Sequence, residues 1–312
     1  CYTSGTTGNP KGVVYSHRSN YLHSMAANAK GAIGLDACST FLPVVPMFHA
    51  NAWGIPFAAA SAGAKLVLNG ACHDPQELQQ YIIDEGVTAT AAVPTIWSGM
   101  LAYLQSSGKN LGKLKNVVIG GSAVPRSMVQ SFKNDYGIAV VHAWGMTETN
   151  PLGSISSPTM EVLAMNEEDQ LTMNCKQGRA VSGVEMRIVS DDGVRLQHDG
   201  IAFGHLQVRG PWVVKSYYKD EGGSPLDAEG WFNTGDVATI DTYGYMQITD
   251  RSKDVIKSGG EWISSIELEN AAVGHPDIIE AAVIGVYHPK WEERPLMVTV
   301  MREGKTISNQ EM

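Results

Sequence analysis

A segment rich in glycine and hydroxyl side chains at the start of the chain is the first candidate for chemistry. It reads Tyr2-Thr3-Ser4-Gly5-Thr6-Thr7-Gly8-Asn9-Pro10-Lys11-Gly12. Such a segment can fold into a loop whose backbone N–H groups point inward and hold an anion, and glycine lets the backbone approach the ligand. The hydroxyls add donors, and Lys11 adds a positive charge suited to phosphate. The segment predicts a phosphate loop, with a plain Ser/Gly linker as the alternative; it is not a Walker A loop, because Gly12 follows Lys11.

A second candidate, Trp144-Gly145-Met146-Thr147-Glu148-Thr149, follows a predicted strand that ends at Val141. Trp144 could stack on a base, Thr147 could bond a phosphate oxygen, and Glu148 could hold Mg²⁺. Magnesium takes oxygen ligands, often one or two carboxylates together with substrate phosphates. The alternative is a solvated glutamate beside a core tryptophan.

A third candidate, Gly120-Gly121-Ser122-Ala123, follows a predicted strand at residues 117–119. Its glycines could let a flat ring lie against the backbone, although a plain tight turn has the same composition. Ligands of open α/β sheets bind where strands end at the carboxyl edge. Both strand-end segments are therefore expected at one edge of a sheet.

Together with the opening loop, these segments resemble the adenylate-forming superfamily of acyl-CoA synthetases, luciferases and peptide-synthetase adenylation domains. Further motifs follow in the right order. Residues 46–49, Pro-Met-Phe-His, resemble the segment whose histidine lies beside the substrate carboxylate. Residues 230–236 end in Asp236 and resemble the segment whose aspartate binds both ribose hydroxyls. Residues 250–261 resemble the hinge, with Arg251 as a second ribose contact.

Within the superfamily the resemblance is closest to fatty acyl-CoA synthetases. Residues 48–53 resemble their substrate gate, which would place Trp53 at the acyl tunnel; a core aromatic is the alternative. A bacterial subgroup that acts on 3-methylmercaptopropionate is similar here too, including residues 142–148. The resemblance thus implies an ATP-dependent ligase that activates a medium- or long-chain fatty acid, or 3-methylmercaptopropionate, through acyl-AMP to the CoA thioester.

The resemblance assigns roles to individual residues, with ATP, Mg²⁺ and CoA as cofactors. Catalytic roles fall to Lys11, His49, Thr147 and Glu148, and Glu148 is the metal ligand. Contacts to the cofactors are expected from Thr3, Ser4, Gly5, Thr6, Thr7, Gly8, Lys11, Gly121, Ser122, Ala123, Trp144, Gly145, Met146, Thr147, Asp236, Arg251, Lys257, Gly259 and Gly260. Contacts to the acid are expected from His49, Trp53, Thr95 and Ala143, and Asp250 is the expected hinge.

Two departures from the family pattern stand out. Trp144 replaces the usual adenine-stacking tyrosine, and its larger π face should preserve stacking. The catalytic lysine of the family lies beyond Met312, and the segments that precede the phosphate loop in the family are missing as well. The sequence also starts with Cys1 rather than Met, so we expect a fragment of a longer protein.

Three other functions stay open. A non-catalytic nucleotide-binding module could share the fold. A peptide-synthetase adenylation domain places an aspartate where this chain has His49, which would leave the ammonium of an amino acid unpaired and costly to bury. A luciferase-like oxygenase differs in its use of O₂, which the sequence does not reveal.

Strands and helices alternate up to Val141, which predicts a mostly parallel sheet covered by helices. Short strands between Gly/Asp turns follow from residue 182 and predict an antiparallel, barrel-like part. We expect a large domain at residues 1–249, divided at 181/182, and the start of a small α+β domain at 250–312. Expected helices include one from Asp74-Pro75, one capped by Thr95 and one capped by Ser264.

The composition of the chain argues against some classes of partner and location. Asp and Glu number 32 against 23 Lys and Arg, so the net charge is −9, which argues against a nucleic-acid partner. No apolar run is long enough for a transmembrane helix, and no signal peptide is visible. The four cysteines form no CxxC pair, which favours a reducing cytoplasm over a zinc site or disulfide framework. A homodimer is left open.

Overall fold

The computed structural model describes residues 1–3, 9–220, 223–252, 254–258 and 261–307. Five residues of the predicted phosphate loop (4–8) and the glycine pair at 259–260 lie outside these ranges. The chain divides into two compact units. They are Cys1–Met186 with Gln207–Asn233 and Gly244–Met246, and Arg187–Leu206 with Thr234–Tyr243 and Gln247–Met312. The expected domain boundaries at 181/182 and 249/250 stay a prediction.

The first unit is built on a seven-stranded sheet in the order β2-β1-β3-β4-β5-β6-β7. Five strands are parallel: β1 (Thr40–Pro43), β2 (Lys65–Leu66), β3 (Ala89–Ala92), β4 (Asn116–Ile119) and β5 (Ala139–Gly145). The last two, β6 (Leu152–Ile155) and β7 (Arg179–Ala180), run antiparallel to their neighbours. The predicted, mostly parallel sheet is confirmed.

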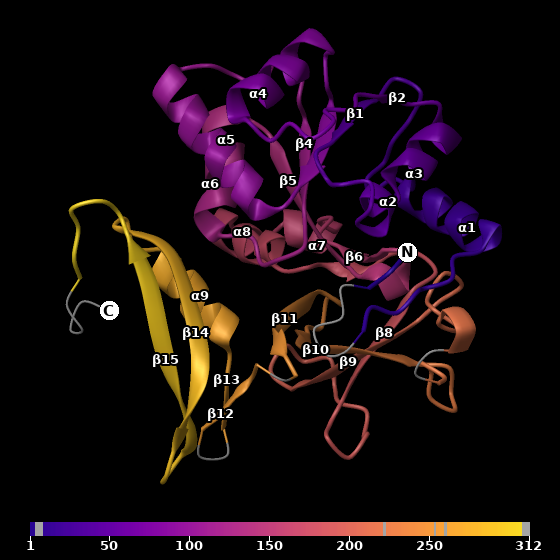
Figure 1. The fold of residues 1–312 in the computed structure, drawn as a ribbon, viewed down its shortest axis with the longest axis vertical. Helices are drawn as coiled ribbons and strands as arrows, with labels where there is room; N and C mark the ends of the chain where they lie inside the picture. Colours follow the sequence, from indigo (N-terminus) through magenta and orange to yellow (C-terminus); the bar gives the residue numbers. More distant parts are fainter. Residues whose placement is uncertain (4–8, 221–222, 253, 259–260, 308–312) are drawn as a thin grey trace. The chain divides into compact units, whose positions relative to one another are not determined.

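Helices cover both faces of the parallel strands. α4 (Pro75–Asp84), α5 (Pro94–Ser107) and α6 (Arg126–Tyr136) pack on one face, and α1 (His17–Ala27) and α3 (Ile55–Ala62) lie on the other (Figure 1). The first face is a continuous apolar core in which Trp97 and Phe132 meet edge to face at 5.6 Å. Alternation along β4 explains this, because Val117 and Ile119 point into that core while Asn116 and Val118 face the other way.

Local signals set most helix starts. The Asp74 carboxylate accepts from the backbone N–H groups of Gln76 and Glu77, and Pro75 occupies the first helical position, as predicted. The prediction that Thr95 caps a helix is wrong: α5 begins at Pro94, and Val93 is its N-cap. Proline suits the first turn because it has no N–H to satisfy there. Two short helices, α7 (Met160–Leu163) and α8 (Glu167–Cys175), had no counterpart in the prediction.

The four strands predicted as a barrel-like part form a meander. They are β8 (Glu185–Val189), β9 (Phe203–Arg209), β10 (Phe232–Ile240) and β11 (Met246–Arg251), in the sheet order β11-β10-β9-β8. Each strand is thus the neighbour of the next one in sequence. Strands that follow one another in sequence commonly lie side by side, even though longer segments connect β8 to β9 and β9 to β10 here.

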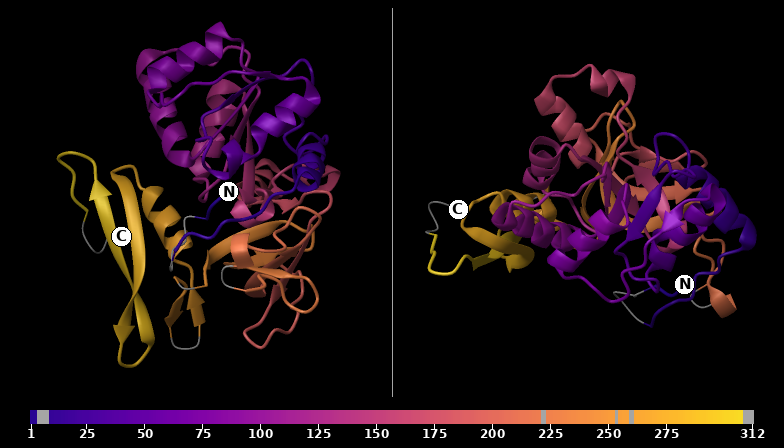
Figure 2. Two further views of the ribbon diagram at one scale, coloured as in Figure 1. Left: turned by 45° about the vertical axis from the view of Figure 1, so that its right-hand side comes forward. Right: turned by 90° about the horizontal axis from the view of Figure 1, so that it is seen from above.

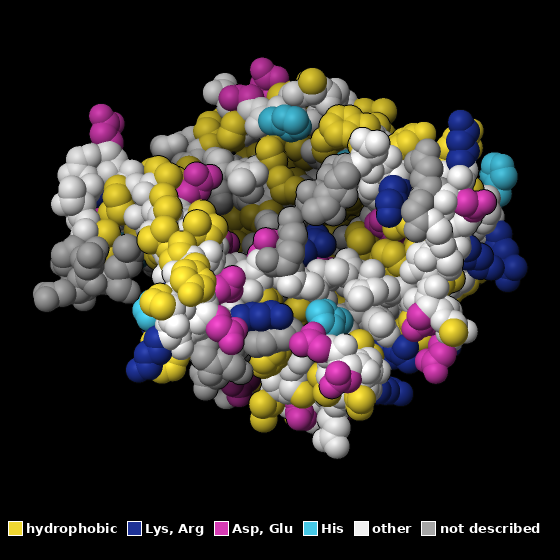
Figure 3. Space-filling model, turned by 60° about the horizontal axis from the view of Figure 1, so that its bottom comes forward, with side chains coloured by type: hydrophobic (Ala, Val, Ile, Leu, Met, Phe, Trp, Pro, Cys, Tyr) yellow, Lys and Arg dark blue, Asp and Glu magenta, His cyan; other side chains and the backbone are white. Residues whose placement is uncertain are grey.

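A third sheet has the order β13-β12-β15-β14. Its strands are β12 (Ile256–Ser258), β13 (Glu261–Ile263), β14 (Ile278–His288) and β15 (Glu292–Met301), and α9 (Ser265–Val273) lies along β14 (Figure 2). Ser264 caps α9 by accepting from Glu267 N–H, as predicted. Hydrophobic side chains gather on the surface over β14 and β15 (Figure 3), and Ile284, Leu296 and Val298 are about half exposed. None of the helices in the described ranges is both long and apolar enough to cross a membrane.

A buried histidine on β5 makes a testable contribution to stability. The ring Nδ1 of His142 lies 2.9 Å from the carbonyl oxygen of Cys175, and burial lowers the pKa of His142 to about 4. In an unfolded chain this pKa is about 6.5. The unfolded state therefore binds a proton at His142 more readily than the folded state does. Neutral His142 contributes fully to the stability of the fold above about pH 6.5, and this contribution is lost as the pH falls toward 4.

We expect His142→Asn, whose amide can still donate to Cys175, to flatten this dependence. In the full-length protein, the loss of unfolding free energy between pH 6.5 and pH 4 should be smaller than in the wild type, by roughly 2–3 kcal/mol. Thermal unfolding of both proteins across this range measures it. Parallel pH profiles for the two proteins would contradict the assignment.

Candidate functional site

Loops at the carboxyl ends of β4 and β5 enclose a cavity of about 60 Å³ in the first unit. Many of the predicted site residues line it, although they come from distant parts of the sequence. They are His49, Trp53, Gly121, Ala143, Trp144, Gly145, Met146 and Thr147. The expectation that the segments after β4 and β5 meet at one edge of the sheet is therefore confirmed, with Gly121 and residues 144–147 at this edge.

A backbone of unusual conformation brings the predicted gate segment to this cavity. The residues of α2 (Ala50–Trp53) all have positive φ, between 45° and 57°. This left-handed conformation is strained for residues with a side chain, and such strain tends to occur at ligand sites. The Trp53 ring lies close to the strand ends in this conformation. A Cβ added at Gly120, just after β4, would lie 3.4 Å from Trp53 Cη2 and 2.8 Å from Ala143 O. The role of Trp53 as a gate stays a prediction.

The chain can reverse between β5 and β6 only because Gly145, at the end of β5, and Gly153, in β6, carry no side chain. A Cβ on Gly145 would overlap the backbone carbonyl of Pro151, and a Cβ on Gly153 would overlap the Trp144 ring. The loop contains a single 3₁₀ turn, η1 (Thr147–Thr149), that follows Met146 directly. Trp144 is 9% exposed and lines the cavity, and its ring lies against Gly153. Its role in stacking on a base stays a prediction.

Glu148 is buried and held from outside the loop. It is 7% exposed; Tyr217 Oη donates to its Oε1 at 3.1 Å, and the Val214 N–H donates to its backbone oxygen at 2.7 Å. Tyr15 Oη donates to the Thr147 backbone oxygen at 2.6 Å. Burial, and secondly the charge of Glu148, raise the pKa of both phenols, so both remain protonated donors. The sequence alone did not predict a role for either tyrosine. Tyr15 stands just after the predicted phosphate loop, and Tyr217 stands between two motifs, and neither position indicates a contact to Thr147 or Glu148.

The described ends of the predicted phosphate loop close on each other. Thr3 N–H donates to Lys11 O at 2.8 Å, and Lys11 N–H donates to Thr3 Oγ1 at 3.2 Å. Thr3 therefore fastens the base of the loop, while the residues between 4 and 8 lie outside the described ranges. The Lys11 ammonium lies 4.9 Å from the centre of the Tyr217 ring, a distance typical of a cation–π contact.

The predicted ribose contacts lie in the second unit and touch each other. Arg251 Nη1 is 3.0 Å from Asp236 Oδ1; the carboxylate is buried and the arginine side chain is 55% exposed. The expected hinge residue, Asp250, is 1% exposed and lies within β11 rather than in a loop. Its carboxylate accepts a hydrogen bond from Ser265 N–H, at the start of α9, at 2.7 Å. Lys257 lies in β12, where its N–H donates to Glu293 Oε2 at 2.8 Å.

Some predicted residues do not line the small cavity. Within the described ranges these are Thr3, Lys11, Thr95, Ser122, Ala123, Glu148, Asp236, Asp250, Arg251 and Lys257. The described residues also contain no group of three or more His, Cys, Asp or Glu side chains that could hold a metal. Mg²⁺ is usually bound by one or two carboxylates, with phosphates and water completing its ligands. Glu148 could supply such a carboxylate.

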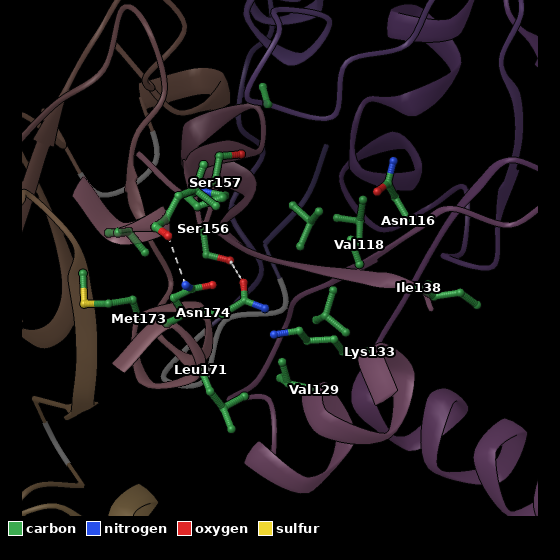
Figure 4. Close-up of a pocket in the computed structure, with 18 of the residues that line it drawn as sticks. Asn116, Val118, Val129, Lys133, Ile138, Ser156, Ser157, Leu171, Met173 and Asn174 are labelled. Atoms are coloured by element: carbon green, nitrogen blue, oxygen red, sulfur yellow. Dashed lines mark hydrogen bonds between the residues drawn. The ribbon is translucent and has the colours of Figure 1, made fainter. Parts of the chain in front are cut away.

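A second cavity, of about 600 Å³, lies along β4 and β5 on the face that also borders the small cavity (Figure 4). Its lining is mainly apolar, with Lys133, Ser156 and Asn174 at one side, where Ser156 Oγ and Asn174 Oδ1 are 3.2 Å apart. None of the predicted site residues lines it. Ile33 and Val118, however, line both cavities, so the two spaces adjoin.

Comparison with known proteins agrees with this geometry. Residues 1–218 match the AMP-binding enzyme family, and residues 267–312 match the AMP-binding enzyme C-terminal domain. The chain is 50% identical, over its whole length, to a medium-chain-fatty-acid–CoA ligase of Ectopseudomonas oleovorans. It is 53% identical, again over its whole length, to a 3-methylmercaptopropionyl-CoA ligase of Ruegeria lacuscaerulensis. It spans 57% and 58% of these two relatives.

A solved structure is similar as well. The O-succinylbenzoate coenzyme A synthetase of Bacillus subtilis, in complex with AMP, superposes with a TM-score of 0.84 at 27% identity. The match covers 99% of this chain and 60% of that one. The predicted adenylate-forming fold is thus confirmed.

The loop between β5 and β6 leads to a prediction about Gly145. In the full-length protein, Gly145→Ala should abolish detectable nucleotide binding and lower the melting temperature, because the new methyl group can be accommodated only if the backbone moves. Gly99→Ala is the control: this glycine lies in α5, and its added Cβ would meet Pro75 Cγ at an ordinary 3.5 Å. Melting with and without ATP and Mg²⁺ measures both. Wild-type ATP protection in Gly145→Ala would refute the constraint.

Proposed function

Because the chain belongs to the AMP-binding enzyme family, we propose that its protein is an ATP-dependent acyl-CoA synthetase. It activates a carboxylic acid as acyl-AMP with release of pyrophosphate, and then transfers the acyl group to CoA. One observation carries the proposal: a single cavity joins a gate-like segment, at His49 and Trp53, to the segment from Trp144 to Thr147. An acid and a nucleotide could meet there. The activity of the whole protein is proposed, since the chain spans little more than half of its relatives.

Charge repulsion is the main obstacle to the first step, in which a carboxylate approaches the α-phosphate of ATP. Lys11, together with the donors proposed for the loop that it ends, would offset this repulsion, and Thr147 would orient the phosphates. A magnesium ion held with the help of Glu148 would supply further neutralising charge. A carboxylate is already a nucleophile, so no general base is needed. Trp144, Asp236 and Arg251 would fix the nucleoside, which is positioning rather than chemistry.

The acid is proposed to be a medium- or long-chain fatty acid. Asn116 and Val118 share one face of β4, and Gly120, just past the end of the strand, continues this row beside Trp53. At about 3.3 Å per residue, this row is roughly 13 Å long. An acyl chain that starts beside Trp53 could follow it past Val118 into the larger cavity, burying methylene groups at about 0.8 kcal/mol each. Activation of 3-methylmercaptopropionate, whose shorter chain would stay near Trp53, is the alternative.

CoA is the proposed second substrate, and the small domain is proposed to rotate between the two half-reactions with Asp250 as its pivot. The hydrogen bond from Ser265 N–H to Asp250 ties β11 to α9 in the described conformation. Rotation at this point would have to release it. Lys257 and the glycine pair at 259–260 are proposed to lie along the CoA channel, and a reducing cytoplasm is the proposed location.

Pyrophosphate release from the full-length protein, measured with acids from C3 to C16, tests the function. We expect acid-dependent release, and a fall in kcat of about 10²-fold or more in Glu148→Gln, since that variant keeps the shape but loses the charge. A non-catalytic nucleotide-binding module would bind ATP without releasing pyrophosphate. Full activity of Glu148→Gln at saturating Mg²⁺ would remove the metal role of Glu148.

The passage between the cavities tests the substrate class. Val118→Phe should reduce kcat/KM for C8 to C16 acids by about tenfold or more while C3 and C4 acids stay within about threefold, because only long chains pass residue 118. Val118→Ala is the matched control and should retain the long acids. The KM for ATP should be unchanged in both. An equal loss for all acids would mean that the acyl chain takes another course.

A further inference from the structure

Residues 212–218 run between the two segments proposed to bind phosphate and metal, and belong to no motif recognised in the sequence. On one side, Trp212 Nε1 donates to Leu152 O at 3.2 Å and Val214 N–H donates to Glu148 O at 2.7 Å. On the other side, Tyr218 N–H donates to Gly12 O at 2.6 Å. The segment therefore holds the exit of the phosphate loop and the Glu148 loop at the same time.

Tyr217 is the residue of this segment whose side chain reaches both. Its hydroxyl donates to Glu148 Oε1 at 3.1 Å, and its ring lies 4.9 Å from the Lys11 ammonium. Its backbone pairs with Val13, just after the phosphate loop. The tyrosine is 9% exposed, and its hydrogen bond to Glu148 is made away from bulk water. Such contacts are worth more there than at an exposed site.

We propose that Tyr217 is a positioning residue that sets the Glu148 carboxylate for the metal and keeps Lys11 beside it. The inference rests on the proposed function. A hydrogen bond to an ionised carboxylate is among the stronger ones, and it fixes the orientation of that group. The aromatic face attracts the ammonium of Lys11 independently of the hydroxyl. The hydroxyl thus orients the carboxylate of Glu148, and the ring holds the ammonium of Lys11.

The two neighbouring tyrosines act differently. Tyr15 donates to the backbone oxygen of Thr147, so it supports the loop and not the carboxylate. Tyr218 is 51% exposed, and its ring faces Lys219 at 5.5 Å. Tyr218→Phe is therefore a matched control next to the residue under test.

The test measures ATP binding by the full-length protein, without acid or CoA, as a function of Mg²⁺. Tyr217→Phe should raise the Mg²⁺ concentration for half-maximal binding about fivefold or more, because the bond to Glu148 is lost. Binding of ATP in EDTA should stay within about twofold, because the ring that faces Lys11 is kept. Tyr217→Leu should weaken binding in EDTA as well, and Tyr218→Phe should match the wild type in both conditions.

A double-mutant cycle separates positioning from a general loss of structure. If Tyr217 acts through the carboxylate, Tyr217→Phe should have little further effect on the Mg²⁺ dependence in a Glu148→Gln background. An equal effect in both backgrounds, or a Mg²⁺ dependence of Tyr217→Phe like that of the wild type, would overturn the inference alone. A wild-type protein that binds no ATP would overturn the proposed function together with it.

Discussion

The site depends on a steric constraint in the two strands, β5 and β6, between which the chain reverses. Gly145 approaches the Pro151 carbonyl, and Gly153 approaches the Trp144 ring, so closely that neither position has room for a methyl group. A parallel sheet normally continues through a helix after each strand, but here the next strand returns antiparallel. The turn that results presents Trp144, Thr147 and Glu148 within five residues of one another, with their backbone fixed by packing.

Elements from elsewhere in the chain complete this arrangement. Tyr15 holds the turn at the Thr147 carbonyl and Tyr217 holds the Glu148 carboxylate. In the segment predicted to contact the acid, the left-handed turn at Ala50–Trp53 brings Trp53 next to Gly120, just after β4. Under the proposed function, the Glu148 carboxylate is already held by a buried hydrogen bond, so little reorganisation of it would be needed when charge develops on a phosphate.

The sequence predicts those features whose causes are local. Asp74 with Pro75 starts a helix, Ser264 caps another, and glycine-rich segments follow β4 and β5, so most elements and the shared strand edge could be expected. Thr95 was misplaced because Pro94 competes for the same helix start. Tyr217 and Tyr15 could not be found, since their bonds to Glu148 and Thr147 cross 69 and 132 residues and depend on how distant segments pack. The pairing of Asp236 with Arg251 was implied only by family resemblance, and the structure places the two side chains in contact.

The most direct measurement of the central claim is a crystal structure of the full-length protein with Mg²⁺ and a non-hydrolysable ATP analogue. The account predicts a metal at about 2.1 Å from a carboxylate oxygen of Glu148 and from phosphate oxygens. It also predicts Lys11 on the phosphates, with Tyr217 still bonded to Glu148. A metal bound elsewhere, with the Glu148 carboxylate turned away from the nucleotide, would contradict it.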